Sequence, residues 1–114
     1  MWPPDRVRMQ HMIEAIESGL RFVRGRTRGD LQTDEMLAFA LIRAVEIVGE
    51  AASRVSESGR ERLPGVPWVD IVSMRTRVIH AYFDVNEDIL WATVTESFPA
   101  LLRELQSALS RESS

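Results

Sequence analysis

The chain has 114 residues, enough for one domain, and we expect residues 1–114 to form a single folded unit. It contains no cysteine, which excludes disulfides, iron–sulfur clusters and cysteine-ligated zinc sites. The net charge is −3 and all 14 basic residues are arginines. No apolar run approaches the ~20 residues of a membrane span, and the first residues do not resemble a signal peptide, so we expect a cytoplasmic protein without membrane contact.

The first predicted helix starts at Pro3 or Pro4, because proline is well tolerated in the first turn of a helix. Apolar side chains then recur at steps of three and four residues, which places them on one face of a helix of about 20 residues. Segment 25–30, with two glycines, interrupts this pattern. The expected stripe is Met9, Met12, Ile13, Ile16, Leu20 and Val23.

The second predicted helix begins after Thr33, a suitable N-cap, and extends to about Ser56. Phe39, Ile42 and Val45 widen its apolar arc beyond the main stripe. A helix with so wide an arc must bury more than one face, and in a small domain the second face usually meets another subunit, so we predict a homodimer. The main stripe is Met36, Leu37, Ala40, Leu41, Ala44, Ile47, Val48, Ala51 and Val55.

Two further helices complete the predicted fold. Pro67 can open the third, which should reach about Tyr82, and Asn86 caps the fourth. Pro99 lies inside the apolar pattern of the fourth helix and has no N–H, so a kink or break is expected there. We therefore predict an all-α, homodimeric, antiparallel bundle of four to five helices.

The two histidines limit the possible metal chemistry. His11 has no partner at metal-ligand spacing, and we interpret it as a surface residue. The sequence has no His-x-x-x-His or Glu-x-x-His pair, no cluster of carboxylates and no glycine-rich phosphate loop. We therefore predict neither a metal site nor a cofactor.

Arginines gather in two short segments, which could be solvated faces or local contacts to phosphate groups. They are Arg21, Arg24, Arg26 and Arg28 in the first segment, and Arg75 and Arg77 in the second.

Segment 74–85 concentrates Arg75, His80 and the only tyrosine, Tyr82. On an ideal helix, Arg75 and His80 would be separated by roughly 140°, so they would converge only if the arginine bends, the helix ends or a second copy contributes. A purely structural reading is also possible. In that reading His80 pairs with Asp84, Tyr82 packs in the core and Arg75 is solvated.

Three segments give the chain a resemblance to the HepT-like branch of the HEPN superfamily, over about residues 6–109. The first is RAVEIVGEAASRVS (43–56), around Gly-Glu-Ala. The second is PWVDIVSMRTRVIHAYFDV (67–85), which contains Arg-x-x-x-x-His followed two residues later by Tyr. The third is ILWATVTESFPALLREL (89–105), with its tryptophan, proline and leucines.

The resemblance implies a metal-independent RNA endonuclease whose cleft forms across a homodimer, with Arg75 and His80 as the catalytic pair. It also implies the toxin of a type VII-like toxin–antitoxin pair, silenced by a minimal nucleotidyltransferase antitoxin that adds AMP to Tyr82. The chain departs from the family at Thr76, a position that is commonly asparagine.

Two other functions remain open from the sequence. The chain could be a non-catalytic HEPN module that binds a nucleotidyltransferase partner or a nucleotide, or a structural dimerisation bundle without a ligand. Glu50 also has two possible roles, because it could hold Arg75 in place or pair with Arg54 one turn along the same helix.

Overall fold

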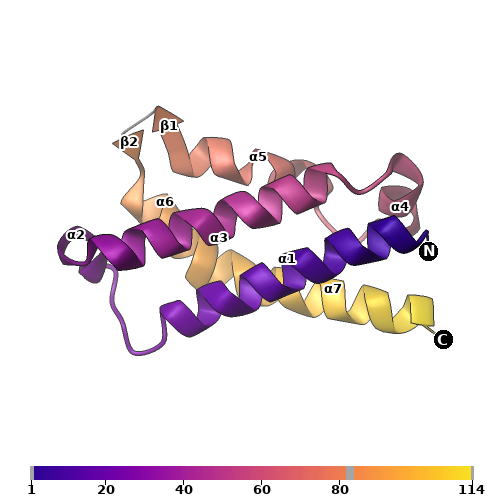
Figure 1. The fold of residues 1–114 in the computed structure, drawn as a ribbon, viewed down its shortest axis with the longest axis horizontal. Coiled ribbons are helices and arrows are strands. Elements are labelled where there is room, and N and C mark those ends of the chain that lie inside the picture. The colour runs from indigo at the N-terminus through magenta and orange to yellow at the C-terminus, as the bar shows by residue number, and fades with distance from the viewer. Residues whose placement is uncertain (1, 82–83, 114) are drawn as a thin grey trace.

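The computed structural model describes residues 2–81 and 84–113, which form an antiparallel helical bundle (Figure 1). This confirms the predicted all-α bundle, while the predicted homodimer stays a prediction. The elements in chain order are α1 (Pro3–Phe22), α2 (Asp30–Thr33), α3 (Glu35–Ser53), α4 (Glu57–Arg62), α5 (Trp68–Val78), β1 (Ile79–Ala81), β2 (Asp84–Val85), α6 (Glu87–Ala92), the π-helical turn η1 (Thr93–Ser97) and α7 (Phe98–Ser113).

Helix α3 lies at the centre of the bundle, between α1 and α5 and antiparallel to both (Figure 1). Helix α7 packs along α1, so both termini lie at the same end of the molecule. The buried side chains of these helices form one hydrophobic core. Within the described residues, no helix combines the length and apolarity needed to cross a bilayer.

The apolar arc of α3 is divided between the core and the surface. Val45 is fully buried and Ile42 is half-buried, because α3 packs against a helix on either side. Met36 and Phe39 are 83% and 62% exposed. The assignment of Met36 to the buried stripe is therefore wrong, since the core-facing stripe starts at Leu37. Whether a second copy covers the exposed side chains stays a prediction.

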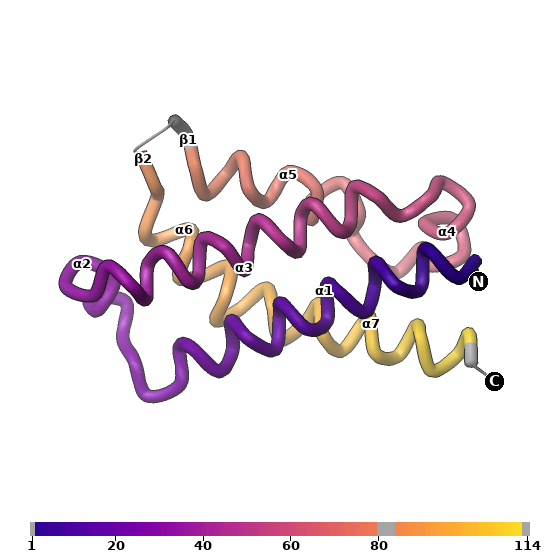
Figure 2. Tube along the Cα trace, in the orientation of Figure 1, coloured from indigo at the N-terminus to yellow at the C-terminus, as the bar shows by residue number. Residues whose placement is uncertain are grey.

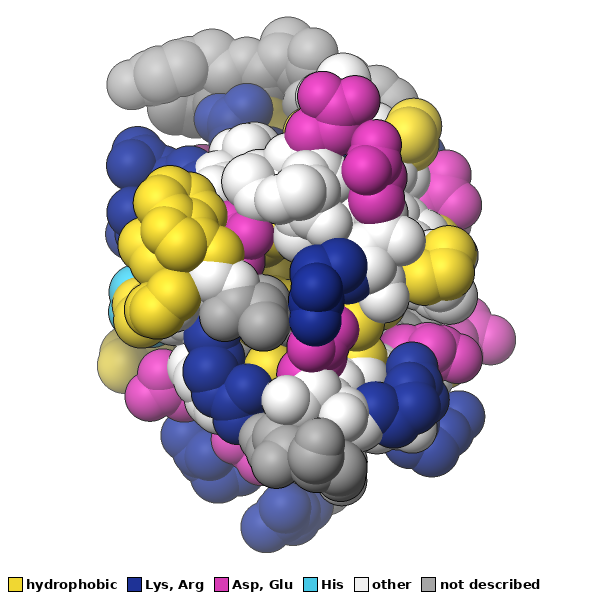
Figure 3. Space-filling view, turned by 90° about the vertical axis from the view of Figure 1, so that its right-hand side faces the viewer, with side chains coloured by type: hydrophobic (Ala, Val, Ile, Leu, Met, Phe, Trp, Pro, Cys, Tyr) yellow, Lys and Arg dark blue, Asp and Glu magenta, His cyan; other side chains and the backbone are white. Residues whose placement is uncertain are grey.

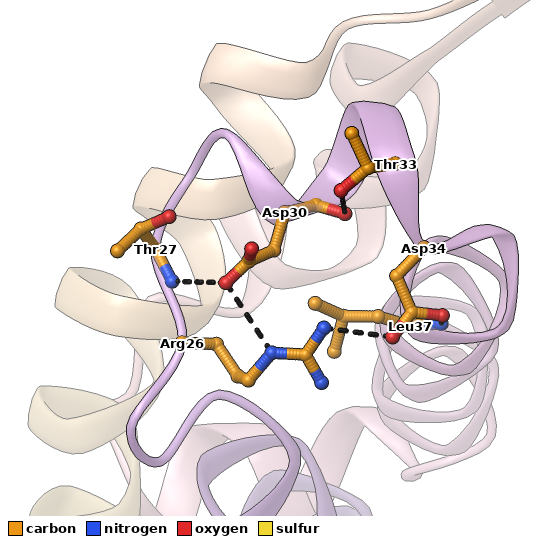
Figure 4. Close-up of polar contacts among 6 residues, drawn as sticks. All are labelled: Arg26, Thr27, Asp30, Thr33, Asp34 and Leu37. Carbon is orange, nitrogen blue, oxygen red and sulfur yellow. Dashed lines mark hydrogen bonds and ion pairs between the residues drawn. The ribbon is translucent and has the colours of Figure 1, made fainter.

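The cap of α3 is Asp34 and not Thr33, which corrects the predicted N-cap. Thr33 ends the short helix α2, and Asp34 accepts a hydrogen bond from the backbone N–H of Leu37 at 3.1 Å (Figure 4). The guanidinium of Arg26 donates to Asp34 at 2.7 Å and to Asp30 at 3.3 Å. This network ties the α1–α2 loop to the start of α3 (Figure 4).

A buried carboxylate joins the start of α1 to the turn between α3 and α4. Asp5 is 1% exposed and accepts hydrogen bonds from the backbone N–H of Ser56, at 2.8 Å, and from its hydroxyl. Ser56 in turn caps α4. A side chain at Gly59 would overlap the carboxylate of Asp5, so only glycine fits there without a rearrangement.

Helix α5 ends at Val78, which corrects the prediction that it reaches about Tyr82. The chain then forms a short antiparallel pair of strands (Figure 1). In this pair Ile79 lies opposite Val85. The backbone N–H of Asn86 donates to the carbonyl of Val78 at 2.8 Å and closes this hairpin. Tyr82 lies outside the described residues.

The last helical segment begins and bends as the sequence predicts. The side chain of Asn86 accepts a hydrogen bond from the backbone N–H of Ile89 at 3.0 Å, which confirms the predicted cap. The interruption expected at Pro99 takes the form of η1, which separates α6 from α7 just before that proline. A π-helical turn shifts the hydrogen-bond register, and it accommodates a residue that cannot donate.

Candidate functional site

Arg75 lies in the last turn of α5 and faces α3. Its Nε donates to Oε2 of Glu46 at 3.2 Å, and the two side chains are 55% and 28% exposed. A single carboxylate therefore orients the guanidinium while more than half of the arginine side chain stays accessible. This geometry suits a group that must meet an external anion.

A hollow of about 330 Å³ lies between α3 and α5 beside Arg75. Gly49 lies where the two helices approach closely, and a Cβ at this position would meet the carbonyl oxygen of Ile71 at 3.5 Å. The hollow is lined by Arg43, Glu46, Gly49, Glu50, Ser53, Val72 and Arg75.

Glu50 does not hold Arg75. Its Oε1 accepts a hydrogen bond from Arg54 at 3.2 Å, so the same-helix pair is the arrangement that the structure shows. The partner of Arg75, Glu46, was missed by sequence reasoning. Helices α3 and α5 are antiparallel and meet at Gly49 and Val72. Arg75, one turn after Val72 on α5, therefore lies opposite Glu46, one turn before Gly49 on α3. This register of the two helices was the signal that could have identified Glu46.

His80 follows Arg75 across the junction between α5 and β1. Because α5 ends at Val78, the backbone of His80 lies in a strand and the 140° helical separation does not apply. The predicted pair thus belongs to two consecutive elements at one end of the bundle. The third predicted residue, Tyr82, is the one outside the described residues.

Thr76 is exposed on α5 between Arg75 and Arg77. Arg77 binds the first turn of its own helix, since its Nη2 donates to the carbonyl oxygen of Asp70 at 3.0 Å. Of the two arginines in this segment, Arg75 is therefore the one that lines the hollow.

Two of the four arginines in the other arginine segment, residues 21–28, are engaged in ion pairs. Arg26 is engaged by Asp30 and Asp34, and Arg28 pairs with Asp88 of α6 at 2.8 Å. These ion pairs fasten the loop after α1 to neighbouring helices. The interpretation of this segment as a phosphate contact is therefore not supported for Arg26 or Arg28.

Within residues 2–81 and 84–113, no group of three or more potential metal-ligating side chains (His, Cys, Asp or Glu) comes together. The ionisable side chains that line the hollow are those of arginine and glutamate.

Comparisons with known proteins agree on one family. A family profile described as "Ribonuclease HepT-like" matches residues 12–108. The chain is 34% identical over 104 residues to a "Putative RNase" of Caldanaerobacter subterraneus subsp. tengcongensis, covering 91% of this chain and 93% of the relative. It is 39% identical over 93 residues to a "Probable ribonuclease HepT" of Thermococcus cleftensis, covering 82% and 84%.

A third relative, a "Putative RNase" of Methanocaldococcus jannaschii, is 32% identical over 95 residues, covering 83% of this chain and 87% of that protein. No solved structure matches the chain significantly. The profile spans most of the chain, including the α5–β1 segment, and the relatives align over nearly their whole lengths. The chain belongs to the HepT-like ribonuclease family.

Proposed function

We propose that this protein is a metal-independent RNA endonuclease of the cytoplasm and acts as the toxin of a type VII-like toxin–antitoxin pair. The observation that carries the proposal is the exposed guanidinium of Arg75, held by Glu46 beside a hollow between α3 and α5. His80 follows in the next element of the chain, β1. Membership of the HepT-like ribonuclease family supports a nuclease-type activity for this arrangement.

The proposed reaction needs no metal or cofactor because RNA carries its own nucleophile. The 2′-oxygen attacks the adjacent phosphorus and its proton passes to the imidazole of His80. The bond from phosphorus to the 5′-oxygen breaks, and that oxygen takes a proton from a second imidazole, His80 of the other subunit of a homodimer. Arg75 stabilises the added charge on the transition state. The products are a 2′,3′-cyclic phosphate and a 5′-hydroxyl.

The test compares the wild-type chain with His80→Ala, Arg75→Ala and the control Arg103→Ala, which removes an exposed arginine from α7. We expect the wild type and the control to arrest growth and to cut total RNA in EDTA, whereas the two site variants lose at least a hundredfold in rate. Cleavage of a fully deoxy substrate would contradict the mechanism, since DNA lacks the 2′-hydroxyl.

Silencing by a minimal nucleotidyltransferase antitoxin is the regulatory part of the proposal. Tyr82 follows Arg75 by seven positions in the sequence. The negative phosphate of an AMP group added to Tyr82 would exclude the substrate phosphate from Arg75 by charge and bulk. We expect Tyr82→Phe to remain toxic and to escape silencing by the antitoxin, as measured by growth on co-expression. Rescue of cells that express this variant, with no tight toxin–antitoxin complex on gel filtration, would contradict it.

Thr76 favours a second candidate, a non-catalytic module of the same family that binds a nucleotidyltransferase partner or a nucleotide. Threonine keeps a hydroxyl in place of the usual amide, and its side chain is exposed beside Arg75. A folded wild-type protein that neither arrests growth nor cuts RNA, yet binds the partner, would favour this candidate over the enzyme.

A further inference from the structure

A second hollow, of about 320 Å³, lies between α1 and α3. It gathers basic side chains from two helices that are far apart in the chain. On α1, Arg8 and His11 are three residues apart and share a face. The lining residues are Arg8, His11, Arg43, Ile47, Glu50, Ala51 and Arg54.

The charge of this hollow is opposite in sign to that of the whole chain. Three arginines and one glutamate give 3 − 1 = +2 with His11 neutral, whereas the chain carries −3. Elsewhere the charges are mixed. At the end of the bundle that bears both termini, arginine and acidic side chains are interspersed (Figure 3). The hollow between α1 and α3 is therefore a local concentration of positive charge.

Within the described residues, most of the basic side chains that line this hollow make no polar contact that holds the fold together. Arg8, His11 and Arg43 form no side-chain hydrogen bond or ion pair with the rest of residues 2–81 and 84–113, whereas Arg54 pairs with Glu50. Arg8 is half-buried, while His11 and Arg43 are exposed. Arginine presents a planar fork of donors that matches a phosphate, and here two such forks are unengaged.

The two hollows are neighbours, because Arg43 and Glu50 line both. One lies between α1 and α3, the other between α3 and α5, and the three helices run side by side (Figures 1 and 2). Adjacent helix axes are about 8–10 Å apart, so the pair of hollows extends over roughly two such spacings. Arginines thus lie across α3 from Arg75 through Arg43 to Arg8, with the carboxylates of Glu46 and Glu50 among them.

We infer that the hollow between α1 and α3 is a substrate subsite that binds a second phosphate of the RNA strand whose scissile phosphate lies at Arg75. This inference rests on the proposed ribonuclease function and adds to it residues outside the Arg75–His80 motif. Arg8, Arg43 and Arg54 bind the phosphate oxygens, and His11 donates a further hydrogen bond. Ile47 and Ala51 supply apolar surface for the ribose between the charged groups.

The test uses the double variant Arg8→Ala/Arg54→Ala, which removes two arginines that line this hollow and not the one beside Arg75. The matched control is Arg103→Ala/Arg111→Ala, which removes two exposed arginines from α7. Binding of a short 2′-O-methyl RNA, which cannot be cut, is followed by fluorescence anisotropy between 50 and 200 mM salt. We expect the Kd of the double variant to rise about tenfold. The salt slope should fall by about 0.7, the value for one phosphate of a single strand.

Cleavage kinetics distinguish an effect on binding at the second hollow from an effect on the chemical step. We expect the double variant to raise KM for a long RNA and to leave kcat for a dinucleotide unchanged, because a dinucleotide cannot reach the second hollow. Equal Kd, salt slope and KM for the double variant and its control would overturn the inference. If the wild-type protein binds the 2′-O-methyl RNA through Arg8 and Arg54 and cuts no RNA, the proposed cleavage fails while the subsite stands.

A variant that is expected to bind RNA more tightly tests the same inference without depending on a loss of binding. Glu50→Gln removes the only carboxylate among the described residues that line this hollow, and it releases Arg54. We expect this variant to bind the 2′-O-methyl RNA several-fold more tightly and with a steeper salt dependence than the wild type. Free AMP and inorganic phosphate serve as competitors. If either displaces the RNA at micromolar concentration, the hollow is a small-anion site and the strand path is overturned.

Discussion

The side chain of Arg75 makes one ion pair, with Glu46, and the carboxylate of Glu46 is the more buried member of that pair. The carboxylate therefore acts as a fixed support, and the guanidinium retains donors that face the hollow between α3 and α5. A pair this exposed contributes less than about 1 kcal/mol to folding. Its effect should appear in the orientation of Arg75 and not in stability.

We therefore expect Glu46→Ala to lower kcat for RNA cleavage about tenfold, with KM and the melting temperature nearly unchanged, because Arg75 acts on charge that develops in the transition state. The double variant Glu46→Ala/Arg75→Ala should be no slower than Arg75→Ala alone. Glu96→Ala, which removes an exposed carboxylate from η1, is the matched control. Additive losses in the double variant would show that Glu46 acts separately from Arg75.

At the scale of the elements, the start of α3 depends on charge as well as on capping. Arg26 donates to Asp34 and lowers the pKa of that carboxyl below its usual value, with a further contribution from the backbone N–H of Leu37. The backbone N–H of Thr27 similarly lowers the pKa of Asp30, aided by Arg26. Both carboxylates thus favour the folded state in their ionised form.

A carboxyl group whose pKa is lower in the folded state stabilises the protein above its unfolded pKa of about 4, and this stabilisation is lost as the pH falls through the folded value. We expect Asp34→Asn, which keeps a good N-cap, to lower the melting temperature at neutral pH and to flatten its fall below about pH 4. Thermal melts from neutral to acid pH measure this effect. Glu96→Gln is the control. If the melting temperature of Asp34→Asn falls with pH as it does in the wild type, ionised Asp34 does not contribute to stability as we propose.

At the scale of the whole molecule, two exposed apolar side chains remain on α3 after the bundle has formed. Met36 and Phe39 share one face, and Arg43, which lines both hollows, lies one turn further along. A second copy packed against this face would bury the two side chains and would lie next to the hollows. The homodimer predicted from the apolar arc thus has a specific candidate surface.

We expect the wild-type protein to be a dimer at micromolar concentration by light scattering and Phe39→Asp to be a folded monomer, because an unpaired carboxylate in a buried interface is costly. Val7→Asp, at another exposed apolar position on α1, should remain dimeric. If the wild-type protein is a monomer, the proposed cleft between two subunits does not form. A dimer that persists in Phe39→Asp would place the interface on another surface.

The sequence by itself determined the four main helical segments, most of their apolar faces and the segment proposed to carry the chemistry. Local rules suffice for these features, because helical periodicity, the Asn86 cap and the missing N–H of Pro99 act within a few residues. The Arg-x-x-x-x-His pattern is local in the same sense. Within the three segments of the resemblance, it helped to identify the family without any knowledge of which side chains meet in space.

Only the tertiary structure decided the end of α5, the cap of α3 and the partner of Arg75. Helix α5 stops at Val78 because the chain closes a hairpin through Asn86, and Asp34 is the cap because α2 takes up Thr33. Glu46, and not Glu50, meets Arg75 because the antiparallel packing of α3 on α5 sets the register. The pair Glu46–Arg75 joins residues 29 apart in the chain, which periodicity and propensity do not encode. The cap of α3 and the end of α5 depend on a competition between helix, turn and strand hydrogen bonds within a few residues.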